Sequence, residues 1–120
     1  MVHVARILVV DADADSRLMV TRFLKLHDHK VSEYAALEHV PSAAGADAFE
    51  VAVINQAPGR TNVDELVKKI MQENNDIKVI AITDATPNVV NGSPVGHEFI
   101  FRPAELATIE NTIRKVLGLP

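Results

Sequence analysis

The chain has 120 residues, of which 48% are hydrophobic and 23% charged, and its formal net charge is −4 at pH 7. These values are typical of one soluble globular domain, so we expect residues 1–120 to form a single folding unit. The absence of cysteine excludes disulfides, thiol nucleophiles and cysteine-ligated metals. The acidic balance argues against direct nucleic-acid binding, and no apolar run approaches the roughly 20 residues of a membrane helix. The amino-terminal residues do not have the pattern of a signal peptide, so we expect a cytoplasmic protein with no membrane partner.

The first part of the chain predicts a strand, a helix and a second strand. Arg6–Val10 is apolar on both faces, as in a strand buried beneath helices on both sides. In Asp15–His27 the predicted stripe at helical spacing is Met19, Phe23 and Leu26, with Val20 and Leu24 beside it. Either Asp13 or Asp15 can cap this helix. Val31–Tyr34 is more mixed and is typical of a strand near a sheet edge.

The middle of the chain predicts two further helices around a buried strand. Leu37–Ala46 is a less regular helical segment, in which Pro41 fits best at a first helical position. Val51–Ile54 is again apolar on both faces. A helix follows, with a capping box formed by Asn62 and Glu65 and an apolar stripe of Val63, Leu66, Val67, Ile70 and Met71.

The last part predicts two strands and a final helix. Lys78–Thr83 is a buried strand and Glu98–Phe101 a more mixed one. Between them, Thr86–His97 contains two prolines, two glycines and two asparagines, which favours a loop with at most one helical turn. The last helix ends at Gly118 and has an apolar stripe of Leu106, Ile109, Ile113, Val116 and Leu117.

Alternation of strands and helices predicts an α/β protein with a parallel sheet covered by helices on both faces. Ligands of such sheets bind at the carboxyl ends of the strands. The residues that follow the apolar runs are therefore candidates for one shallow pocket, namely Asp11, Asn55, Thr83 and Arg102.

Three motifs, ILVVDADADSR, VIAIT and FIFRPAELATIENTIRKVL, resemble the receiver domain of two-component response regulators, and the resemblance extends from Arg6 to Gly118. It implies a flavodoxin-like, doubly wound, five-stranded parallel sheet with strand order 2-1-3-4-5. It also implies a phosphoacceptor aspartate after the third strand and two acids after the first strand that hold Mg²⁺. A Thr or Ser after the fourth strand and a Lys after the fifth then contact the phosphoryl group.

The residues at these positions depart from the receiver pattern. Asp11 matches the first acid and Thr83 the hydroxyl, whereas Ala12 replaces the second acid. Asn55 stands at the phosphoacceptor position and Arg102 at the lysine position. The position of the receiver's aromatic switch residue is held by Phe99.

These replacements predict a pocket without phosphoryl-transfer chemistry. An amide is not an anionic nucleophile, and phosphoryl transfer also needs a metal to neutralise developing charge. Asp11 and Arg102 carry cancelling charges, so we expect Mg²⁺ binding to be weak or absent, with no cofactor and no catalytic residue. The spacing of Asp13 and Asp15 suits helix capping better than metal binding. Without a metal, Arg102 can pair with Asp11 and with the Asn55 side-chain oxygen.

The sequence therefore predicts a pseudo-receiver that is not an enzyme and works through protein–protein contact. Its expected partners are a histidine kinase, a phosphotransfer protein or an output protein. The irregular segment before the fifth strand corresponds to the fourth receiver helix, shortened or unwound; its expected apolar partner surface consists of Val89, Val90, Val95 and Phe99.

Two alternatives remain open. The chain can instead be a sensor that binds a small anion through Arg102 and Thr83, or a receiver phosphorylated at Asp11, Thr83 or Ser16. A flavodoxin-like redox protein is disfavoured, because the chain has no tryptophan and one tyrosine to stack on a flavin. The histidines show no metal-ligand spacing, and we expect all five at the surface: His3, His27, His29, His39 and His97.

Overall fold

The computed structural model describes residues 5–36, 49–55, 77–83, 98–101 and 103–119. The elements are β1 (Arg6–Asp11), α1 (Ala14–Leu26), β2 (Lys30–Tyr34), β3 (Val51–Asn55), β4 (Lys78–Thr83), β5 (Glu98–Phe101) and α4 (Leu106–Val116). The helices expected within residues 37–46 and 62–71, and the irregular segment 86–97, lie outside the described residues. None of the described helices is long and apolar enough to cross a membrane.

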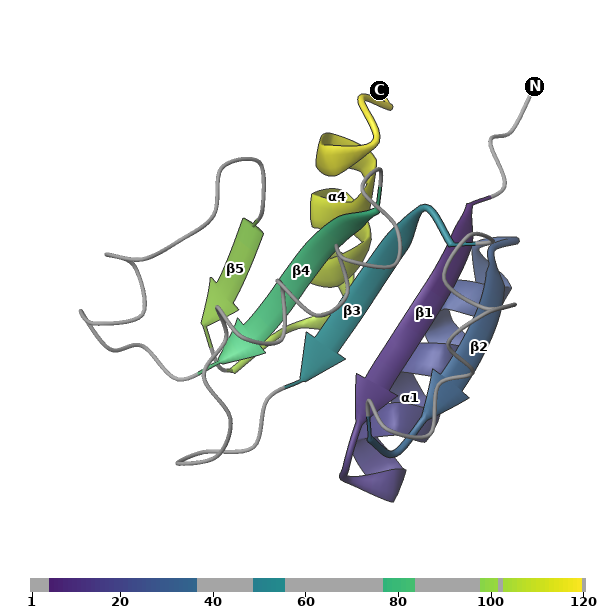
Figure 1. The fold of residues 1–120 in the computed structure, drawn as a ribbon, viewed down its shortest axis with the longest axis vertical. Helices are drawn as coiled ribbons and strands as arrows, with labels where there is room; N and C mark the ends of the chain where they lie inside the picture. Colours follow the sequence, from purple (N-terminus) through teal and green to yellow (C-terminus); the bar gives the residue numbers. More distant parts are fainter. Residues whose placement is uncertain (1–4, 37–48, 56–76, 84–97, 102, 120) are drawn as a thin grey trace.

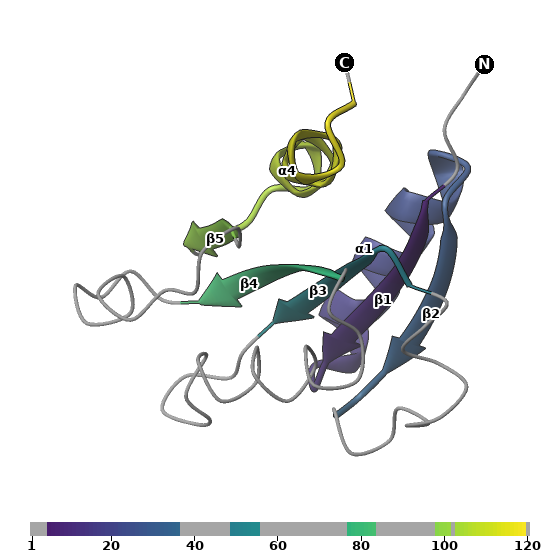
Figure 2. The same ribbon diagram turned by 45° about the horizontal axis from the view of Figure 1, so that its top comes forward.

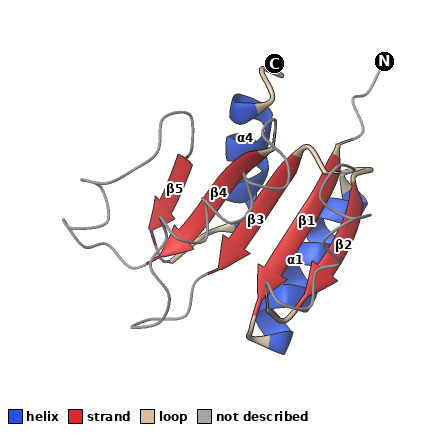
Figure 3. Cartoon of the chain, viewed as in Figure 1, coloured by secondary structure: helices blue, strands red, loops and turns tan. Residues whose placement is uncertain are grey.

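The strands form one five-stranded sheet in the order β2-β1-β3-β4-β5, and every pairing is parallel (Figures 1 and 3). The predicted α/β class and the strand order 2-1-3-4-5 are thus confirmed. The register pairs Asp11, the last residue of β1, with Asn55, the last residue of β3. Because the strands are parallel, their carboxyl ends meet at the same edge of the sheet, and these two polar residues end side by side.

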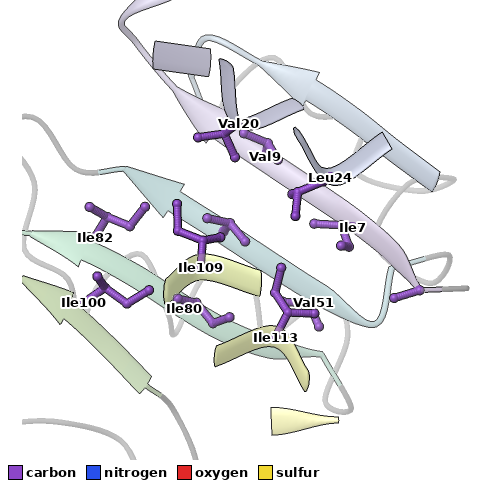
Figure 4. Close-up of a cluster of buried hydrophobic side chains, with 12 residues drawn as sticks. Ile7, Val9, Val20, Leu24, Val51, Ile80, Ile82, Ile100, Ile109 and Ile113 are labelled. Atoms are coloured by element: carbon purple, nitrogen blue, oxygen red, sulfur yellow. The ribbon is translucent and has the colours of Figure 1, made fainter. Parts of the chain in front are cut away.

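Alternate residues of each strand point to opposite faces of the sheet, and both faces are buried. One face carries Ile7, Val9, Val51, Val53, Ile80, Ile82 and Ile100 (Figure 4). The other carries Leu8, Val10, Ala52, Ile54, Val79 and Ala81. Burial on both faces explains why the central strands are continuously apolar, since each large side chain removed from water contributes roughly 1.5–3 kcal/mol.

Both described helices pack on the same face of the sheet, α1 against β1 and β2, and α4 towards β4 and β5 (Figure 2). The predicted stripe of α4 is confirmed: Ile109 and Ile113 are fully buried in the core. Leu106, Val116 and Leu117 are partly buried and pack against the same cluster.

The predicted stripe of α1 is only partly correct. Val20 and Leu24 are buried and Phe23 packs against the core, but Met19 and Leu26 are 58% and 82% exposed. The helix is apolar on two sides, so helical spacing alone does not select the buried one. Packing against β1 and β2 selects the side that carries Val20 and Leu24.

The ends of α1 are held by local hydrogen bonds. Asp13 is the cap at the amino end, where its Oδ1 accepts the N–H groups of Asp15 at 2.9 Å and Ser16 at 3.1 Å. At the other end Asp28 adopts a left-handed conformation, with φ of 68°. The Asp28 and His29 N–H groups bond back to the carbonyls of Lys25 and Leu24, which is a Schellman motif.

The carboxyl end of α4 is closed in the same way. Gly118 has φ of 69°, and its N–H bonds to the Lys115 carbonyl while the Leu119 N–H bonds to the Arg114 carbonyl. The predicted end of the helix at Gly118 is therefore confirmed, and a glycine meets the backbone requirement at no steric cost.

His29 is buried, and its predicted surface location is wrong. Its Nδ1 accepts the Ala5 N–H at 3.3 Å, so the ring proton resides on Nε2, which donates to Glu110 Oε1 at 2.9 Å. Arg114 closes the cluster with an ion pair of 3.3 Å to Glu110 Oε2. Each polar atom of the imidazole thus has a partner, which permits burial. His27 is exposed as predicted, and the other three histidines lie outside the described residues.

Candidate functional site

A cleft of about 790 Å³ opens at the edge of the sheet where β1, β3 and β4 end. Its polar lining comes from Asp11, Asp13, Ser16 and Asn55. Its apolar lining comes from Ala12, Val20, Ile82, Pro103, Ala104 and Ile109. The structure therefore brings Asp11, Ala12 and Asn55 together, at the edge where strand-end residues of a parallel sheet bind ligands.

Asp11 is the buried charge of the cleft, with 4% of its surface exposed. Its Oδ1 accepts the N–H of Asp13 at 2.9 Å, and its Oδ2 accepts Nδ2 of Asn55 at 3.1 Å. The Arg17 guanidinium donates to the Asp11 backbone carbonyl at 2.6 Å. Both carboxylate oxygens are thus hydrogen-bonded within the protein, which compensates the cost of burying the charge.

Asn55 acts as a hydrogen-bond donor in this arrangement. Its Nδ2 points at the Asp11 carboxylate and also lies 3.4 Å from the Ser16 hydroxyl oxygen. A carboxylate at this position would accept rather than donate, and would face Asp11 with like charge. The Asn55 amide therefore forms a hydrogen bond with Asp11, whereas an aspartate at position 55 would be repelled by Asp11.

The described residues do not fit the Mg²⁺ site of a receiver. Ala12 is exposed and offers no side-chain ligand, and Asp13 Oδ1 is engaged in capping α1. Within the described ranges no group of three or more His, Asp or Glu side chains converges as a metal site would require. Mg²⁺ is usually held by one or two carboxylates together with phosphate oxygens and waters, and the described residues supply only the buried, hydrogen-bonded carboxylate of Asp11 at the receiver's acidic positions.

The other predicted site residues are placed only in part. Thr83 is the last residue of β4, and it pairs with Phe101 of β5; Phe99 lies in the same strand. Arg102 lies outside the described residues, so the predicted contact between Arg102 and Asp11 also lies outside them. The next residue, Pro103, lines the cleft. Val89, Val90 and Val95 also lie outside them.

Sequence reasoning missed the role of Arg17. Its Nε pairs with Glu33 Oε1 of β2 at 3.2 Å, while its other end holds the carbonyl of Asp11. Arg17 thereby ties the start of α1 to the ends of two neighbouring strands. The only signal was an arginine in the first turn of a helix that follows a strand directly, and this signal does not identify its acceptors.

The comparisons with known proteins bear on the fold. Neither a protein-family model nor a curated protein matches this sequence. Solved structures do match: the chemotaxis response regulator CheY4 of Vibrio cholerae has a TM-score of 0.71 and 22% identity, over 95% of this chain and 99% of that chain. The receiver domain of the hybrid histidine kinase CckA has a TM-score of 0.75 and 22% identity, over 93% and 98%.

A third similar structure comes from a differently described protein. It is a pilus assembly-related protein from Burkholderia pseudomallei, with a TM-score of 0.77 and 17% identity, over 98% of this chain and 92% of that chain. All three likenesses span nearly the whole length of both chains, and they agree with the parallel order β2-β1-β3-β4-β5. The chain therefore has the fold of response regulator receiver domains.

Proposed function

We propose that the protein is a receiver-like signalling module that acts through protein–protein contact without being phosphorylated. The observation that carries this proposal is the hydrogen bond from Asn55 Nδ2 to Asp11 Oδ2 at 3.1 Å. This bond joins Asn55, at the phosphoacceptor position, to Asp11, the one metal-binding acid of the receiver pattern that remains. The two polar side chains therefore satisfy each other.

The electrostatics support the same conclusion. A phosphorylatable site needs an anionic nucleophile and a bound divalent cation to offset the charge of the incoming phosphoryl group. Asn55 is neutral and Ala12 supplies no ligand. Asp11 is the one acid of the receiver pattern that remains, and each of its two oxygens already accepts a hydrogen bond within the protein.

The similar structures suggest the setting in which such a module works. They include a chemotaxis response regulator and the receiver domain of a hybrid histidine kinase. We infer that the protein works in two-component or phosphorelay signalling in the cytoplasm, with a histidine kinase, phosphotransfer protein or output protein as its partner. No catalytic step and no cofactor belong to this function.

The proposal is tested by NMR with beryllofluoride and Mg²⁺, which together mimic the phosphorylated state. We expect the amide signals of Asp11, Asn55 and Thr83 to remain unchanged, because the cleft offers neither acceptor nor metal site. The matched control is the double variant Ala12→Asp, Asn55→Asp, which restores both acids and should gain Mg²⁺-dependent shifts. Saturable shifts around Asn55 in the unaltered protein would refute the proposal.

The two alternatives receive less support from the described residues. The charged side chains that line the described part of the cleft are Asp11 and Asp13, which repel a small anion, so the sensor depends on Arg102. For phosphorylation at another residue, the candidate acceptor that the described residues favour is Ser16, because its hydroxyl lies beside Asn55 in the cleft. Mass spectrometry after incubation with acetyl phosphate and Mg²⁺ distinguishes it, since we expect no added phosphate on Asp11, Ser16 or Thr83.

A further inference from the structure

The exposed large hydrophobic side chains of the described residues all belong to α1. Leu18, Met19 and Leu26 are 42%, 58% and 82% exposed. None of the three lines the cleft at the end of the sheet. Single exposed apolar residues are ordinary, but three on one helix form a patch that calls for a partner.

The three side chains share one side of the helix. At 100° per residue, positions 15, 18, 19, 22 and 26 fall within a narrow sector, directly opposite the buried Val20 and Leu24. We call this sector the outer stripe, and it consists of Asp15, Leu18, Met19, Arg22 and Leu26. From residue 15 to residue 26 it is about 16 Å long. Among the described elements, none covers it (Figures 1 and 2).

The charges on the outer stripe are ordered along the helix. Asp15 lies in the first turn and Arg22 follows towards the carboxyl end, with Lys25 beside the stripe in the last turn. Within the described part of the chain, none of these three side chains takes part in an ion pair. If two copies of α1 ran parallel, like charges would face each other. If they run antiparallel, Asp15 of each copy faces Arg22 and Lys25 of the other, and the two helix dipoles also oppose favourably.

We propose that two copies of this chain associate through the outer stripe, with α1 packed antiparallel against α1 about a two-fold axis. A two-fold interface uses the same patch on both copies, which the self-complementary charge order permits. With Asp15 opposite Arg22, the axis passes between Leu18 and Met19, which form the apolar centre, and Leu26 lies at the periphery. The Asp15–Arg22 pairs lie on either side of the axis. The interface is independent of the cleft, so it stands whether or not the cleft is phosphorylated.

The small size of the stripe favours a weak, reversible association. Three turns of one helix bury well under the roughly 800 Å² per partner of a standard stable interface. We therefore expect a reversible dimer that is monomeric at about 10 μM and substantially dimeric at about 1 mM.

Sedimentation equilibrium over this concentration range tests the dimer. Leu18→Glu and Met19→Glu should each weaken association at least about tenfold, because each buries an unpaired charge in the apolar centre. The matched control is Ala107→Glu, the same charge change on an exposed position of α4, which should leave the association unchanged. Circular dichroism of each variant verifies that the fold is retained. A monomer at every concentration would overturn the proposal.

A charge-reversal cycle tests the antiparallel arrangement itself. Asp15→Arg and Arg22→Asp should each weaken association about 3- to 10-fold, since two exposed ion pairs contribute modestly. The double variant, Asp15→Arg with Arg22→Asp, restores opposite charges across the axis and should recover most of the loss. Recovery of association by the double variant would show that residues 15 and 22 of one copy pair with those of a second copy, which an unrelated partner would not produce. Failure of the double variant to recover association would exclude this arrangement.

Discussion

Replacing Asn55 by Asp converts the central hydrogen bond of the cleft into a like-charge contact. The amide nitrogen lies 3.1 Å from Asp11 Oδ2, and Asp11 is almost fully buried. The variant loses a hydrogen bond to a charged acceptor, worth about 1.5–3 kcal/mol. The repulsion between two carboxylates at this partly buried edge adds about 1–2 kcal/mol, between the values for water and for an effective dielectric constant of 20. We therefore expect Asn55→Asp to lower the free energy of unfolding by about 2.5–5 kcal/mol at pH 7.

Urea unfolding of three variants separates the two contributions. Asn55→Leu removes the donor without adding charge, so it should lose less stability than Asn55→Asp. The exchange variant, Asp11→Asn with Asn55→Asp, places one amide opposite one carboxylate again and should recover most of the loss. For Asn55→Asp the deficit should shrink on acidification, because the carboxylates no longer repel once one of them is protonated.

Two results would refute this account of the cleft. One is an Asn55→Asp variant as stable as the unaltered protein at pH 7. The other is an exchange variant that recovers nothing, since the Asp11 and Asn55 side chains would then not act as a pair.

Three further predictions concern the scaffold, and urea unfolding measures each of them. Glu110→Ala leaves the buried Nε2–H of His29 without an acceptor, so we expect a loss of about 2–3 kcal/mol, and little change in His27→Ala, which alters an exposed histidine. Asp28→Val places a β-branched residue at a φ of 68° and should cost about 1–2 kcal/mol, whereas Asp28→Gly should not destabilise. Ile113→Ala opens a cavity in a fully buried position and should cost about 2–5 kcal/mol, while the exposed Thr108→Ala should cost far less.

The elements that could be predicted are those whose local sequence pattern is compatible with only one secondary structure and one buried face. Val51–Ile54 is apolar on both faces and can only be buried on both sides. Ile109 and Ile113 recur on one side of a helix whose other side is polar, so the buried face follows directly. Asp11 and Asn55 follow two such strands, and parallel pairing necessarily brings their ends together.

The elements that could not be predicted depend on contacts between distant segments. α1 is apolar on two sides, and only packing against β1 and β2 decided that Val20 faces inward and Met19 outward. His29 can be buried because Glu110, 81 residues away, accepts a hydrogen bond from its ring, and nothing near His29 in the sequence indicates this. Arg17 likewise finds its acceptors on two strands.

By itself, then, the sequence determined the strands, the α4 stripe and the neutral amide at the end of β3, since these depend on residue type and local periodicity. Only the tertiary structure decided that this amide donates to Asp11 and that the outer stripe of α1 remains exposed. The physical reason is that a hydrogen bond or a buried face needs a partner, and chain folding supplies that partner from elsewhere in the molecule.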